Sequence, residues 1–187
     1  MAGRRAWIIG FLAFVCAGGC GKASPTAPTH AATPITGPRI LLAGQSGAFF
    51  LLPYLPEAIN FSNIDGSINY WLTNRDFAER ATTPPLLAFV WWQGSADVAM
   101  TVEEYAQKLR ALIEIARSGN GTLPVRIVEI AEFPIRASVK EAQRRVAADA
   151  GVEMIPTADL LCADAACHLT PQGFQTVRDR IYRSLGR

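Results

Sequence analysis

Two side chains far apart in the sequence could together perform nucleophilic chemistry. The chain contains only two histidines, and His30 lies in a segment rich in Pro, Thr and Ala. His168 is therefore the one imidazole that a folded domain could use. Far upstream, an apolar run ends in Gly44-Gln45-Ser46-Gly47. A serine hydroxyl is a weak nucleophile near neutral pH and a neighbouring histidine activates it, so Ser46 and His168 are the predicted pair.

Ser46 also has a structural interpretation, because a serine that follows a strand often only caps the next helix. The pattern around it further invites comparison with the Gly-x-Ser-x-Gly nucleophile elbow of α/β-hydrolases. Ala48 replaces the final glycine of that elbow, and the serine follows the first predicted strand rather than a later one. Both differences count against the α/β-hydrolase fold.

The elements that would position this pair can be read from hydrophobic runs and periodicity. A capping box, Thr101-x-x-Glu104, opens a helix that ends near residues 119–121, and Val139–Ala150 predicts a second helix. A third begins at Thr170-Pro171, with proline in its first turn. Five apolar runs predict buried strands over Arg39–Ala43, Ala58–Ile64, Leu86–Trp92, Val125–Ile130 and Val152–Ile155.

This alternation of strands and helices predicts a parallel sheet covered on both faces. Sites in such folds lie in the loops that leave the carboxyl ends of the strands. Ser46, Gly66, Gln93 and His168 all fall in loops of this kind, which favours a catalytic interpretation.

The amino-terminal region predicts export. Arg4 and Arg5 precede a short apolar stretch, and small residues lead to Cys20, as in a bacterial lipoprotein signal. We expect residues 1–19 to be the signal, Cys20 to carry lipid, residues 20–38 to form a flexible tether and residues 39–187 to form the domain. The alternative is an ordinary secretory signal cut nearby, which gives a periplasmic or secreted protein.

Charge and cysteine content narrow the partners further. The formal net charge is +2, and removal of Arg4 and Arg5 with the signal leaves equal numbers of basic and acidic residues. Such a domain has no basic stripe for nucleic acid. Cys162 and Cys167 predict a short disulfide loop in an oxidising compartment, with two free buried thiols as the alternative. Two cysteines and one histidine are few ligands for a metal site.

Taken together, the motifs resemble those of the SGNH hydrolase superfamily, and within it the sialate O-acetylesterase-like carbohydrate esterases. The family's Gly-Gln-Ser-Asn nucleophile motif is matched by Gly44-Gln45-Ser46, with Gly47 replacing Asn. Its Trp-x-Gln-Gly-Glu-x-Asp motif is matched by residues 91–97, with Ser95 replacing Glu. Further matches are Lys140-Glu141-Ala142-Gln143-Arg144, Thr157-Ala158-Asp159-Leu160 and the histidine block of residues 168–174.

The resemblance implies a three-layer α/β/α, flavodoxin-like fold with a parallel sheet of about five strands. It also implies ester hydrolysis without a metal or organic cofactor, often the deacetylation of sugars. Ser46 would be the nucleophile and His168 its base. The family places an acid three residues before the histidine, where this chain has Ala165. Asp164 is the first candidate for the orienting acid, Asp159 the second, and a backbone carbonyl the third.

The superfamily's oxyanion hole would correspond here to the Ser46 N–H, the Gly66 N–H and a group near Gln93. The alternatives are that Gly66 is only a turn glycine and that Gln93 supports the loop by packing and hydrogen bonding. Neighbouring strand residues point to opposite faces, so one of Trp91 and Trp92 should face the core. The other could form the floor of a sugar site or pack between the sheet and a helix.

The expected function is therefore that of a serine esterase acting on short acyl esters, with acetyl esters of carbohydrates or small molecules as the expected substrates. Its expected location is the bacterial cell envelope, with Cys20 as the link to the membrane. Two alternatives stay open. One is a glycan-binding envelope lipoprotein that keeps the fold without catalysis, because the Asn and Glu of the family motifs are replaced. The other is a lipase or thioesterase of the same superfamily.

Overall fold

The computed structural model describes residues 37–83, 85–130 and 136–187 of the chain. The predicted signal (residues 1–19), the proposed lipid attachment at Cys20 and the predicted tether up to residue 36 lie outside the described residues. Within those three ranges, no helix combines the length and the apolar character that crossing a membrane requires.

The centre of the domain is a five-stranded sheet in which all neighbouring strands run parallel, in the order β2-β1-β3-β4-β5. The predicted α/β fold and all five predicted strands are confirmed. Residues of β1 and β3 are buried on both faces of the sheet, which explains their unbroken apolar sequences. The strands are β1 (Arg39–Gly44), β2 (Ala58–Ser62), β3 (Leu86–Trp92), β4 (Val125–Val128) and β5 (Glu153–Ile155).

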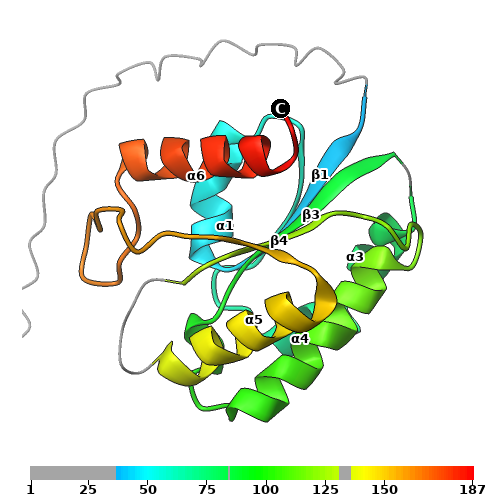
Figure 1. Ribbon diagram of the computed structural model, residues 1–187, viewed down its shortest axis with the longest axis horizontal. Helices are drawn as coiled ribbons and strands as arrows, with labels where there is room; N and C mark the ends of the chain where they lie inside the picture. The colour runs from blue at the N-terminus through cyan, green and yellow to red at the C-terminus, as the bar shows by residue number, and fades with distance from the viewer. Residues whose placement is uncertain (1–36, 84, 131–135) are drawn as a thin grey trace, which may run out of the picture. The chain divides into compact units, whose positions relative to one another are not determined.

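Helices cover both faces of the sheet (Figure 1). α1 (Ser46–Leu51) and α6 (Pro171–Ser184) lie on one face, and α3 (Arg75–Ala81), α4 (Val102–Arg117) and α5 (Ala137–Ala150) lie on the other. The three long predicted helices are confirmed as α4, α5 and α6. The capping box forms as predicted, since the Thr101 hydroxyl accepts from the Glu104 N–H at 3.2 Å and the Glu104 carboxylate accepts from the Thr101 N–H at 2.9 Å.

The short helices were not predicted from the sequence. α1, α2 (Ile68–Thr73) and α3 each have only six or seven residues, which is too few turns for a hydrophobic period to be read. Two short 3-10 helices complete the connections, η1 (Leu52–Tyr54) and η2 (Ser95–Asp97). The structure also ends β2 at Ser62 and β4 at Val128, two residues earlier than the apolar runs indicate.

The sheet brings the ends of β1 and β3 together. In a sheet of this order the chain leaves β1 and β3 in opposite directions, and ligands bind in the crevice between such strands. Gly44 makes the close approach possible, because it has φ +140° and a Cβ there would lie 2.1 Å from the Trp92 carbonyl oxygen. The next residue, Gln45, donates its N–H to the same carbonyl at 3.0 Å.

Candidate active site

Ser46, His168 and Asp164 form a continuous chain of hydrogen bonds at the carboxyl end of the sheet. Ser46 is the first residue of α1, directly after β1, and its Oγ lies 2.9 Å from His168 Nε2. His168 Nδ1 lies 2.6 Å from an oxygen of Asp164. A carboxylate at Nδ1 favours the tautomer that carries its proton there, which leaves Nε2 to accept from the serine hydroxyl.

Asp164 is held to His168 through both of its carboxylate oxygens. One oxygen faces Nδ1, and the other accepts the backbone N–H of His168 at 3.0 Å. The hydrogen bond with the imidazole, and after it the bond from the His168 backbone, hold the pKa of the Asp164 carboxyl below its ordinary value. The acid therefore stays ionised and can stabilise a positive charge on the ring.

Asp159, the second candidate for the orienting acid, has a different partner. Its two carboxylate oxygens accept from the Arg180 guanidinium at 2.9 and 2.5 Å. These bonds lower the pKa of the Asp159 carboxyl and tie the loop after β5 to α6. Between the two candidates, the geometry favours Asp164.

The imidazole is also restrained by an aromatic neighbour. Phe50 lies one helical turn after Ser46 on α1, and its ring meets that of His168 edge to face, with centroids 5.0 Å apart and planes at 71°. Such contacts favour a fixed mutual orientation of the two rings. α1 therefore provides both the hydroxyl and one wall of the histidine site.

Gln45, the residue before the nucleophile, ties together the loops that follow three strands. Its buried side-chain oxygen accepts the N–H groups of Gly94, Ser95 and Ala96 at 3.1, 2.8 and 3.2 Å. Its side-chain nitrogen donates to the Ile64 carbonyl at 3.3 Å. The glutamine of the motif thus sets the loops after β2 and β3 relative to Ser46.

Two of the predicted oxyanion donors are engaged elsewhere. The Gly66 N–H donates to the Asn63 carbonyl at 3.0 Å, as expected of a turn glycine. Gln93 is buried, and its side-chain nitrogen donates to the Gly66 carbonyl at 3.3 Å and to Asp97. The geometry favours the structural alternative for both residues. The backbone N–H of Ser46 remains as a candidate oxyanion donor, because the first residues of a helix have N–H groups without intrahelical partners.

Gln93 belongs to a buried polar network beneath the site. Its side-chain oxygen accepts from the Tyr105 hydroxyl at 2.7 Å, and its carbonyl accepts from the Gln143 side chain at 2.8 Å. Asp97 also accepts the Ile68 N–H at 2.8 Å, which joins the loop after β3 to α2. Asp97 and Gln143 belong to the motifs described above, but no local pattern in the sequence indicates these roles.

Two hollows share the Ser46–His168 pair in their walls. The outer one has a volume of about 330 Å³ and polar walls that include Asp65, Ser95 and Arg136. The inner one is far smaller, about 40 Å³. Its walls combine small and apolar residues with polar ones, among them Gly47, Trp92, Gly94, Ile130, Leu169 and Phe174 beside Gln45, Gln93, Ser95, Arg136 and Thr157.

Trp92 explains why this chain has glycine after the nucleophile. A Cβ at position 47 would lie 2.8 Å from the Trp92 indole, so a larger residue there would require the ring to move. Trp92 is buried against α1 and α6 and lines the inner hollow, whereas Trp91 is fully buried on the other face beside Tyr105. Trp92 thus both packs the helices and forms a wall of the site.

Comparison with known proteins identifies relatives by sequence and by fold. Residues 67–185, more than half of the chain, match the protein family described as carbohydrate esterase, sialic acid-specific acetylesterase. The matched range contains Asp164 and His168 and begins after Ser46. No curated protein sequence matches the chain significantly.

Solved structures share the fold at low sequence identity. A lipolytic G-D-S-L family protein from Veillonella parvula is 14% identical with TM-score 0.63, over 81% of this chain and 100% of its own. A family 3 carbohydrate esterase from Talaromyces cellulolyticus is 12% identical with TM-score 0.58, over 80% and 96%. A peptidoglycan O-acetylesterase is 12% identical with TM-score 0.59, over 69% and 45%.

The contact between Asp164 and the imidazole can be tested through the pKa of the acid. In His168→Ala, we predict that the Asp164 pKa rises toward its ordinary value, because the imidazole no longer stabilises the carboxylate. An NMR titration of the carboxyl carbons measures it. Asp159 is the internal control, since its pKa is set by Arg180 and should not change. An Asp164 pKa that is the same in both proteins would contradict the contact.

Proposed function

Because this chain belongs to the carbohydrate esterase family of sialic acid-specific acetylesterases, we propose that it is a serine esterase that removes short acyl groups, acetyl above all, from carbohydrates. The observation that carries the proposal is the chain of hydrogen bonds from Ser46 through His168 to Asp164. That arrangement can activate a hydroxyl as a nucleophile, and the residue types are those of a serine esterase.

The reaction proceeds in two halves. The Ser46 oxygen attacks the ester carbonyl while His168 Nε2 takes the hydroxyl proton, and Asp164 stabilises the imidazolium that forms. Collapse of the tetrahedral intermediate breaks the bond to the alcohol, which leaves with that proton, and an acyl group remains on Ser46. Water then attacks the acyl group while His168 accepts a proton from the water. His168 passes this proton to the Ser46 oxygen, and the carboxylic acid is released.

The negative oxygen of the intermediate needs donors that are in place beforehand. The Ser46 N–H at the start of α1 supplies one. The polar network below Gln93 and the three bonds to Gln45 hold the loop after β3 fixed beside it. Their part in the reaction is to keep the site in one geometry while charge develops.

The two hollows support the substrate class. An inner volume of about 40 Å³ has room for only a few water molecules, which is comparable with an acetyl group and too small for a long acyl chain. The outer hollow offers the carboxylate of Asp65 as a partner for sugar hydroxyls. The hydroxyl of Ser95 and the guanidinium of Arg136, which line both hollows, are two further partners. We assign the acyl group to the inner hollow and the alcohol to the outer one.

We also propose, from the sequence of residues 1–20, that the protein is exported and anchored by lipid at Cys20. The disulfide between Cys162 and Cys167 fits a compartment outside the cytoplasm. Partitioning of wild type and Cys20→Ser between membrane and soluble fractions tests the anchor, and an unchanged distribution would exclude it.

The central role of Ser46 is tested by replacing it. We predict that Ser46→Ala lowers kcat for an acetyl ester at least about 1,000-fold, because no other group can attack the carbonyl from that position. Ser118→Ala is the matched control, since that serine directly follows the last residue of α4 and its hydroxyl donates to the Ile115 carbonyl at 2.7 Å. Circular dichroism checks that both variants are folded.

The outcomes also separate the enzyme from a glycan-binding protein. If Ser46→Ala keeps the wild-type rate, the nucleophile is misassigned. If neither protein hydrolyses the ester and both bind an O-acetylated glycan equally well, the chain is a binding module rather than an esterase.

Acyl length is tested with a series of esters that share one alcohol. We predict that kcat/KM for the acetyl ester exceeds that for the hexanoyl ester at least about 10-fold, because the inner hollow excludes additional methylenes. Ile130→Ala enlarges this hollow and should reduce the difference in kcat/KM between the acetyl and the hexanoyl ester. A wild-type enzyme that prefers the longer chain would show that the acyl group binds elsewhere and would favour the lipase or thioesterase alternative.

A further inference from the structure

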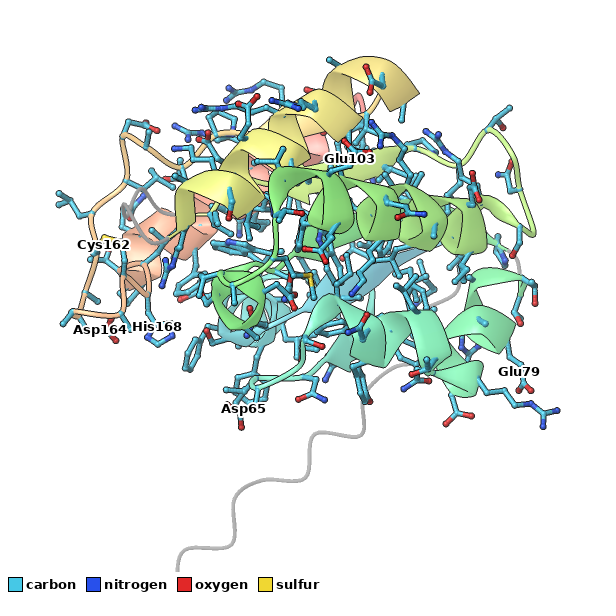
Figure 2. All side chains as sticks on the ribbon, turned by 90° about the horizontal axis from the view of Figure 1, so that it is seen from below. Asp65, Glu79, Glu103, Cys162, Asp164 and His168 are labelled. Atoms are coloured by element: carbon cyan, nitrogen blue, oxygen red, sulfur yellow. A yellow bond between two sulfur atoms is a disulfide. The ribbon has the colours of Figure 1, made fainter. Side chains whose placement is uncertain are left out.

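The acid and the base of the site lie on one short loop that a disulfide closes. Cys162 and Cys167 are bonded, so the covalent ring encloses Asp164, and His168 follows the ring directly. Figure 2 shows Cys162, Asp164 and His168 together at one end of the domain, far from Glu79 of α3. Only residues 165–167 of the loop therefore separate the acid from the base in the sequence.

Backbone contacts turn this loop back on itself. Cys162 and Leu169 form an antiparallel bridge, and the Ala163 N–H donates to the His168 carbonyl at 2.6 Å. Cys167 donates its N–H to the Asp164 carbonyl at 3.0 Å and has φ +58°, a conformation that residues other than glycine rarely adopt. This turn places an aspartate four residues before the histidine, one further than in the family motif, next to the imidazole.

Packing contributes little to holding the turn. Residues 161–166 are exposed, and the Asp164 side chain is about half exposed at 49%. An exposed ion pair seldom offsets the conformational entropy of a free loop. Outside the ring, Arg136 donates to the Ala166 carbonyl at 3.3 Å. The disulfide is the one covalent restraint on the position of the acid among the described residues.

We propose that the Cys162–Cys167 disulfide is a positioning element of the active site, which keeps Asp164 on His168 and makes the rate of the enzyme depend on the oxidation state of this pair. The proposal rests on the esterase function proposed above. A dithiol reductant transfers two electrons and two protons to the bond, two thiols form, and the dithiol becomes its cyclic disulfide. The opened loop then no longer holds the carboxylate at Nδ1, and the imidazolium loses its stabilising charge.

The test compares hydrolysis of an acetyl ester by the oxidised and the dithiothreitol-reduced protein. We predict that reduction lowers kcat about 100-fold, as expected for a misplaced catalytic group, with KM nearly unchanged because the hollows lie mostly outside the loop. Reoxidation restores the rate. The double variant Cys162→Ser/Cys167→Ser should have the kcat of the reduced protein, and dithiothreitol should not change that kcat.

Asp164→Asn provides the decisive control. Since this variant lacks the acid already, reduction should leave its low residual kcat unchanged, whereas a merely structural bond would lower it by the same factor as in wild type. A reduced wild type with full kcat, or an equal loss in Asp164→Asn, would overturn the proposal. An oxidised wild type without any ester hydrolysis would instead reject the esterase function.

Discussion

The hydrogen bond between His168 Nε2 and Ser46 Oγ is the constraint on which the rest of the site depends, because it joins two loops 122 residues apart. Each partner is placed by a different part of the fold. β1 and the turn at Gly44 deliver the serine to the first position of α1, and the loop after β5 delivers the imidazole from the other direction. Phe50, on the same helix as Ser46, then limits the orientation of the ring.

The motif residues around the pair act mainly by fixing loops. Gln45 holds three consecutive amides of the loop after β3, and Gln93 and Asp97 connect that loop to the turn after β2 and to α2. A buried polar network rigidifies its surroundings when its members find partners, and a partner removed leaves a costly unpaired group. The conformation of the site thus depends on buried hydrogen bonds of side chains that are not among the three reacting residues.

Much of this could be predicted from the sequence, and the remainder has identifiable physical causes. Buried parallel strands produce unbroken apolar runs, so the strands of the sheet could be predicted. The scarcity of histidine indicated His168 as the catalytic base. The choice of Asp164 over Asp159 depends on a left-handed turn at Cys167 and on an ion pair with Arg180, neither of which has a local sequence signal. The partners of Gly66 and Gln93 likewise depend on how three loops meet.

The most direct test of the account is to trap the intermediate. An acetyl ester is mixed with the protein, the reaction is quenched in acid within the first turnover, and peptides are analysed by mass spectrometry. The account predicts one acetyl group, located on Ser46, and its absence when His168 is replaced by alanine. A protein that hydrolyses the ester while the acetyl group is found on another residue, or that acetylates Ser46 equally well without His168, would contradict it.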